Sequence, residues 1–133
     1  MKAIRLILFV TGVLLLLASP LLLLGPVHDW LGRLNTKYSS KFSREKFAEL
    51  SVGMPRSAVV ALLGPPLDTY TLTNYPVWAI SDAGVRARYG KDAELQIETL
   101  SFSRSKRSGD YEMVSVWIGP DTNVIHHCRG VTD

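Results

Sequence analysis

Disulfide-stabilised and catalytic signatures are both missing from this 133-residue sequence. It contains one cysteine, Cys128, which excludes an internal disulfide and neither requires nor forbids an oxidising compartment. It has no Gly-rich phosphate-binding loop, no Gly-x-Ser-x-Gly motif and no metalloprotease motif. The sequence therefore predicts a protein that is not an enzyme and that needs no cofactor.

The chain also lacks a broad excess of positive charge. Its formal net charge is +3, but Lys2 and Arg5 stand at the extreme N-terminus, and without them the net charge is +1. Proteins that bind nucleic acid usually present a strongly basic face with interleaved aromatic side chains. The near-neutral remainder of the chain argues against a nucleic-acid partner.

What the sequence does contain is a long uncharged run near its N-terminus, from Leu6 to Leu24. At about 1.5 Å per helical residue, a run of this length reaches roughly the 30 Å of a bilayer's hydrocarbon core. Lys2 and Arg5 form a positive n-region, and no A-x-A-like cleavage site follows. We therefore expect residues 1–27 to be an uncleaved signal anchor with one transmembrane helix.

This anchor predicts a single-pass membrane protein with its C-terminal domain outside the cytoplasmic membrane. The alternative is a cleaved signal peptide, which would release the domain. Residues 28–41 are mixed and polar and form either a juxtamembrane linker or a helix extension. Trp30 in this stretch suits either the aromatic belt of the interface or a packed linker.

Residues 42–133 have the patterns of one small domain. Ser43 is expected to cap a short helix that carries Phe47 and Leu50 on one face. A second helix begins near Pro55 and carries an apolar stripe of Val59, Leu62 and Leu63, which Gly64 terminates. A tight glycine turn joins the two helices.

Strand-like segments follow the helices. They are rich in β-branched and aromatic residues, and the last two flank a turn: residues 75–80, 94–102, 111–118 and 123–128. This order predicts an α+β fold in which two short helices pack on one face of a small antiparallel sheet, a two-layer sandwich.

The run LSVGMPRSAVVALLGPP, from Leu50 to Pro66, resembles the signature of the SmpA/OmlA (BamE-like) family of outer-membrane assembly lipoproteins. Trp78 and the closing strand, turn and strand around Gly119 continue the likeness, but the lipid-bearing cysteine of that family is absent. The resemblance implies structural roles for six residues: Gly53, Met54, Val59, Leu63, Gly64 and Pro66. It also implies a non-enzymatic protein-binding module of the bacterial cell envelope, in outer-membrane protein assembly or envelope maintenance. With the uncleaved anchor, the chain would be a single-pass protein of the bacterial inner membrane with its C-terminal domain in the periplasm, and after cleavage the domain would be periplasmic or secreted. An inhibitor-like or small-ligand-binding domain of the same fold, secreted after signal cleavage, is the alternative.

Two groups of residues are candidate sites. His126, His127 and Cys128 offer imidazole beside thiol, but on a strand His127 and Cys128 point to opposite faces, and His126 is about 7 Å from Cys128 along the backbone. We therefore predict no catalytic residues and no metal site. Partner or lipid contacts are expected instead at four residues: Arg104, Lys106, Arg107 and Trp78.

Overall fold

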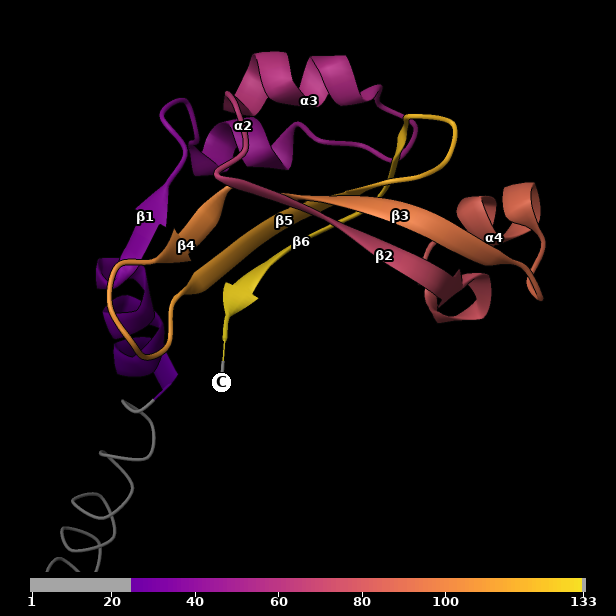
Figure 1. The fold of residues 1–133 in the computed structure, drawn as a ribbon. Coiled ribbons are helices and arrows are strands. Elements are labelled where there is room, and N and C mark those ends of the chain that lie inside the picture. Colours follow the sequence, from indigo (N-terminus) through magenta and orange to yellow (C-terminus); the bar gives the residue numbers. More distant parts are fainter. Residues whose placement is uncertain (1–24, 133) are drawn as a thin grey trace, which may run out of the picture.

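The computed structural model describes residues 25–132 and has an α+β fold with antiparallel sheets and short helices (Figure 1). Residues 25–34 are helical. The other helices are α2 (Arg44–Ala48), α3 (Arg56–Leu63), α4 (Ala83–Tyr89) and a single 3-10 turn, η1 (Val77–Ala79). The predicted transmembrane run falls on residues 1–24, outside the described residues, and no helix among the described residues is long and apolar enough to cross a membrane.

Four strands form the main sheet in the order β2-β3-β5-β6, and all neighbours are antiparallel. They are β2 (Asp68–Pro76), β3 (Glu94–Ser101), β5 (Glu112–Ile118) and β6 (Val124–Val131). The predicted closing hairpin is confirmed as β5 and β6, with β6 extending three residues further than expected. A separate two-stranded sheet pairs β1 (Thr36–Tyr38) with β4 (Ser103–Ser105).

The two predicted helices lie over one face of the main sheet, as expected (Figure 1). Ser43 caps α2, because its side chain accepts a hydrogen bond from the backbone N–H of Lys46 at 3.2 Å. A first cluster of buried apolar side chains lies between these helices and the sheet. The segment of α2 and α3 contributes Phe47, Leu50, Val59 and Leu63 to it. These side chains pack on a sheet surface formed by Leu100, Phe102, Val114, Val116, Ile118 and Val124.

A second apolar cluster lies on the opposite face of the sheet and was not predicted. Val124 belongs to the first cluster and the adjacent Ile125 to the second, which places the two clusters on opposite faces because strand side chains alternate. Val77, Ile80 and Val85 cover this face at the end of the sheet near α4. The expected arrangement of two layers with one covered face is therefore too simple.

The predicted strand over residues 75–80 is right only for residues 75 and 76 and wrong for the rest. The strand runs earlier, as β2, and the chain then turns through η1. Pro76 has no N–H to donate to a sheet ladder, and the register of β2 shifts between Leu72 and Tyr75, where Asn74 has a positive φ of 56°. Turning the chain here brings Val77 and Ile80 inward together, which an extended strand would not do.

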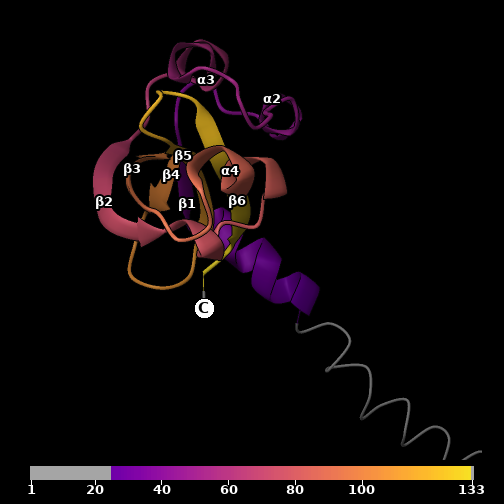
Figure 2. The same ribbon diagram turned by 90° about the vertical axis from the view of Figure 1, so that its right-hand side faces the viewer.

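Residues 28–41, expected to be a linker or a helix extension, lie against the rest of the domain. The helix ends at residue 34, and β1 follows directly with Thr36 and Ser39 buried. Gly32 on the helix approaches Val131 on β6 so closely that a Cβ at position 32 would stand 2.7 Å from a Val131 methyl group. The helix is thus seated on the end of the main sheet (Figure 2).

Candidate functional site

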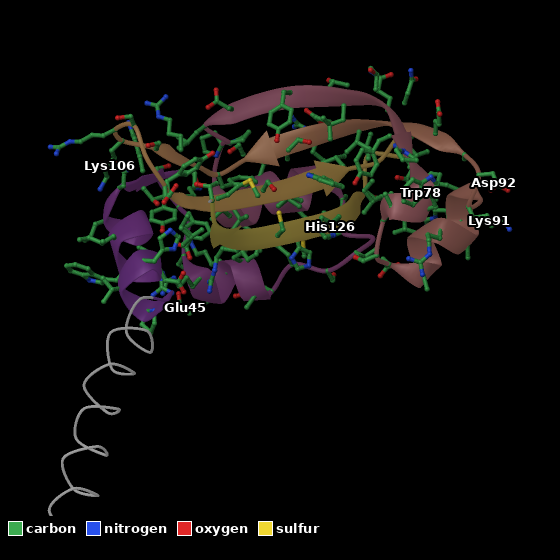
Figure 3. The ribbon with its side chains drawn as sticks, turned by 90° about the horizontal axis from the view of Figure 1, so that it is seen from below. Glu45, Trp78, Lys91, Asp92, Lys106 and His126 are labelled. Atoms are coloured by element: carbon green, nitrogen blue, oxygen red, sulfur yellow. The ribbon has the colours of Figure 1, made fainter. Side chains whose placement is uncertain are left out.

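The predicted contact residues fall at two separate places. Arg104 lies on β4, and Lys106 and Arg107 lie in the loop that follows it. Trp78 lies on η1 and is 70% exposed. Figure 3 shows Lys106 and Trp78 at opposite ends of the molecule. The structure therefore brings the three basic residues together and keeps Trp78 apart from them.

An exposed row of apolar side chains lies on the helix of residues 25–34. Val27, Trp30, Leu31 and Leu34 are between 45% and 57% exposed. Their spacing of three, four and seven residues places them on one helical face, which we call the apolar stripe. Trp30 is 57% exposed, so the packed-linker interpretation of this residue is not what the structure shows.

Residues 104–107 are the end of β4 and the start of the loop after it, and we call them the basic loop. They are attached to the end of this helix. The Lys106 side chain donates to the Leu34 carbonyl at 3.0 Å, and the Lys106 backbone N–H donates to the Asn35 carbonyl at 2.7 Å. Asn35 also accepts from the Arg107 backbone N–H at 3.1 Å through its side-chain oxygen. A groove of about 400 Å³ runs between the two, lined by Leu31, Leu34, Asn35, Lys106 and Arg107. Apolar and cationic side chains therefore share one surface.

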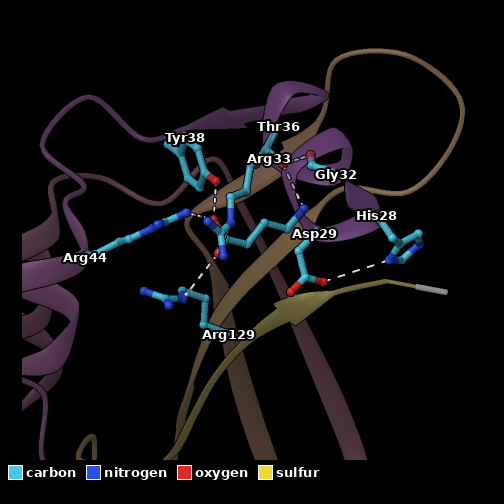
Figure 4. Close-up of polar contacts among 9 residues, drawn as sticks. His28, Asp29, Gly32, Arg33, Thr36, Tyr38, Arg44 and Arg129 are labelled. Atoms are coloured by element: carbon cyan, nitrogen blue, oxygen red, sulfur yellow. Dashed lines mark hydrogen bonds and ion pairs between the residues drawn. The ribbon is translucent and has the colours of Figure 1, made fainter. Parts of the chain in front are cut away.

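A buried carboxylate holds this end of the molecule together. The Glu112 side chain on β5 is only 4% exposed. Figure 4 shows the side chains of Tyr38, Arg44 and Arg129 pointing toward one common place. The Glu112 oxygens lie 3.3 Å from Arg129 Nε, 3.5 Å from an Arg44 terminal nitrogen and 3.9 Å from Arg33 Nε. The Tyr38 hydroxyl donates to the same carboxylate. Burial of the phenol, and its hydrogen bond and proximity to Glu112, raise the pKa of Tyr38 above 10.0.

Further polar contacts fix the helix to the sheet beside Glu112. The Thr36 hydroxyl accepts from the Glu112 backbone N–H at 2.8 Å and donates to the Gly32 carbonyl at 2.7 Å. His28 lies 3.0 Å from an Asp110 carboxylate oxygen. The Glu112 cluster, consisting of Glu112, Tyr38, Arg33, Arg44 and Arg129, therefore joins the N-terminal helix, β1, α2, β5 and β6.

Sequence reasoning missed both the apolar stripe and the Glu112 cluster. The stripe had a local signal, the helical spacing of Val27, Trp30, Leu31 and Leu34, which extends over fewer than three turns. The Glu112 cluster had none, because Tyr38 and Glu112 are 74 residues apart in the chain.

The histidine and cysteine candidates lie on β6 and face different neighbours. The His127 ring packs edge-on against Phe47 at 5.5 Å, on the α2 side, whereas His126 packs against Trp117 at 4.9 Å on the other face. The Cys128 sulfur lies 3.1 Å from the Ser115 hydroxyl. Burial, and to a lesser degree the neighbouring His127, lower the pKa of His126 below 6.5. Within residues 25–132 no three His, Cys, Asp or Glu side chains are grouped as metal ligands would be.

The residues of the family-like motif form the connection between α2 and α3 and the body of α3. Gly53 has a φ of 90° and donates to the Val124 carbonyl at 2.8 Å, and Met54 accepts from the Val124 N–H at 2.8 Å. Val59 and Leu63 are fully buried. Gly64 has a φ of 84° and ends α3, and the half-exposed Pro66 follows it.

No family model matches this chain, and no match is found among curated proteins or solved structures. Any function for the site must therefore be argued from its geometry and from the sequence.

Proposed function

We propose that this chain is a non-enzymatic, membrane-tethered protein-binding module of the bacterial cell envelope. One observation carries the tether: the uncharged run Leu6–Leu24 immediately precedes the helical residues 25–34, which the Glu112 cluster joins to the rest of the domain. Because these residues are helical and packed on the domain, they are not a loose linker between the domain and the proposed anchor.

The partner-binding part of the proposal concerns Trp78. Its indole is 70% exposed at the end of the molecule away from the helix of residues 25–34 (Figure 3). Large aromatic side chains are enriched at the buried centres of protein interfaces, and one that protrudes far from a tether can reach a second protein. The resemblance of residues 50–66 to SmpA/OmlA proteins supports a partner in outer-membrane protein assembly or envelope maintenance.

The test uses the full chain in bacterial membranes. A photo-crosslinking residue replaces Trp78, and the matched control places it at Glu45, an exposed position on α2 (Figure 3). We expect the chain to stay with the membrane after an alkaline wash and position 78 alone to crosslink to an envelope protein. Release by the wash would overturn the tether, and equal or absent crosslinking at the two positions would overturn the binding role. Intact mass would show whether residues 1–27 remain attached.

A further inference from the structure

The apolar stripe lacks the burial that large apolar side chains normally gain on folding. Single exposed apolar residues are common on protein surfaces, but contiguous groups usually mark a contact surface. Here four such residues occupy one face of one helix, and Leu31 and Leu34 line the groove that Lys106 and Arg107 close. The surface is therefore suited to a partner that is apolar on one side and anionic on the other.

We infer that the occupant of this surface is a lipid bilayer containing anionic phospholipid, with the helix of residues 25–34 lying in the headgroup region. The inference rests on the proposed tether and deepens it by naming what the stripe contacts. Acyl chains and glycerol would cover Val27, Trp30, Leu31 and Leu34, while lipid phosphates would lie near Lys106 and Arg107.

The position of the stripe in the chain supports a bilayer over a second protein. Val27 stands only three residues after Leu24, the last residue of the uncharged run. A bilayer that holds this run is always within reach of the stripe, because the connection keeps its effective concentration high. A protein partner would have to displace lipid from the same place.

Charge at the groove supports an anionic surface in particular. Lys106 and Arg107 line the groove and are exposed, and the exposed Arg104, which pairs in register with the exposed Lys37 on β1, precedes Lys106 by two residues in the chain. Lysine and arginine side chains close to an anionic membrane are attracted to its surface. The apolar stripe alone would suit any bilayer, whereas the basic loop favours one with negative headgroups.

The orientation of the helix makes Leu34 the decisive position. If a helix continued from Leu24 perpendicular to the membrane plane, Leu34 would lie about 15 Å beyond Leu24, at roughly 1.5 Å per residue. The interfacial region of a bilayer is only about 5–7 Å deep on each side. Only a helix lying along the surface places Leu34 among lipids. Pro26 has no N–H, so a helix that continued from Leu24 would lack one hydrogen bond here, which eases a change of direction at this position.

The experiment places a fluorescent label at position 34 of the full chain, in a Cys128→Ser background with Leu34→Cys. The protein is reconstituted into vesicles of phosphatidylcholine with phosphatidylglycerol that contain lipids carrying a nitroxide quencher near the headgroup. The matched control is Trp78→Cys, another large exposed apolar residue on a helical segment. We expect quenching at position 34 to be several-fold stronger than at position 78.

Equal quenching at the two positions in protein that still floats with the vesicles would overturn this inference and leave the tether standing. Protein that does not float would overturn the tether and the inference together.

The charge requirement is tested in the labelled Leu34→Cys protein. Arg107→Glu reverses an exposed charge, while the contacts that Asn35 makes with residue 107 involve only the backbone and persist. We expect the wild-type loop to give stronger quenching with phosphatidylglycerol than with phosphatidylcholine alone, and Arg107→Glu to abolish the difference. Lys91→Glu, an exposed reversal at the other end of the molecule, should keep it (Figure 3). No lipid dependence, or the same loss in both variants, would overturn the anionic part of the inference.

Discussion

Glu112 balances three arginine side chains that reach it from different segments of the chain. Arg33, Arg44 and Arg129 are between 33% and 42% exposed, whereas the carboxylate is 4% exposed. A buried carboxylate loses most of its hydration, so it needs charged or hydrogen-bonding partners to be tolerated. The carboxylate also stabilises the three arginines, because it offsets the repulsion among their positive charges.

Replacing Glu112→Gln should lower the free energy of unfolding by about 2 kcal/mol. The amide keeps the shape of the side chain but leaves three arginines without their counter-charge, and the cost stays below that of a fully buried pair because the arginines reach solvent. Urea denaturation of the two proteins measures the difference.

Glu98→Gln is the matched control for this substitution. It disrupts the bidentate contact of Glu98 with Arg56, which consists of two hydrogen bonds of 2.8 Å each. Both side chains are about one third exposed or more. Such a surface pair is worth about 0–1 kcal/mol, so an effect equal to that of Glu112→Gln would contradict the role given to Glu112.

Helix α3 lies between two glycines whose backbones adopt left-handed conformations. Gly53 and Gly64 have φ values of 90° and 84°. The turn at Gly53 lets residues 53–56 bond to Val124 at the start of β6 and to Thr122 in the turn before it, and Gly64 ends the helix next to Lys41. The α3 element is therefore placed by its two ends as well as by its apolar face.

Substituting Gly64→Ala should destabilise the protein by about 1–2 kcal/mol. The new methyl group would force a disfavoured backbone conformation, and it would stand 3.1 Å from the Lys41 Cβ. Gly130→Ala is the control, because a methyl group there would meet nothing within 4 Å and the φ of Gly130 is not left-handed. Thermal unfolding followed by circular dichroism gives the melting temperature of each variant, and equal values for Gly64→Ala and Gly130→Ala would refute the role of Gly64.

Elements with a strong local pattern were predictable, and those without one were not. Ser43, Val59 and Leu63 mark α2 and α3 because caps and apolar spacing act within a few residues. Strand β2 is exposed along most of its length, so it shows no alternation of buried and exposed side chains. Helix α4 was not predicted. Asp82 caps it, with its carboxylate accepting from the Val85 N–H at 2.9 Å, but the helix has only seven residues and one buried side chain, too few to give an apolar pattern.

At the scale of the whole molecule, one sheet carries an apolar cluster on each face. Strand β3 contributes Leu100 to the first cluster and Ile97 to the second, so neither cluster can form without the strand that the other also needs. The sequence predicted a single covered face, since Val77 and Ile80 come from the region mistaken for a strand and no helix was predicted where α4 carries Val85.

This sharing predicts one cooperative unfolding transition. Leu63→Ala in the first cluster and Ile97→Ala in the second should each cost about 2–5 kcal/mol, because both side chains are fully buried. Circular dichroism, which follows the whole backbone, and fluorescence, to which Trp117 beside the second cluster contributes, should give coincident denaturation curves in both variants. Curves that separate in either variant would show that the two clusters unfold independently.

The candidate site was predictable only in part, because some of its residues are neighbours in the sequence and others are not. The charged residues Arg104, Lys106 and Arg107 are adjacent in the sequence and could be recognised together. The helix they adjoin comes from residues 25–34, and the contacts between these regions span 72 residues, as between Asn35 and Arg107. One sequence carries no local trace of such a pairing.

The packing of the helix of residues 25–34 on the domain also has a consequence for the order of folding. Its supports come from late in the chain: Asp110 stands 82 residues after His28, Glu112 stands 76 residues after Thr36, and Val131 touches Gly32. Closing such long loops is slow, so the helix docks only after the main hairpins have assembled. The position of the helix relative to the main sheet is therefore the last part of the fold to be fixed, once β6 is in place.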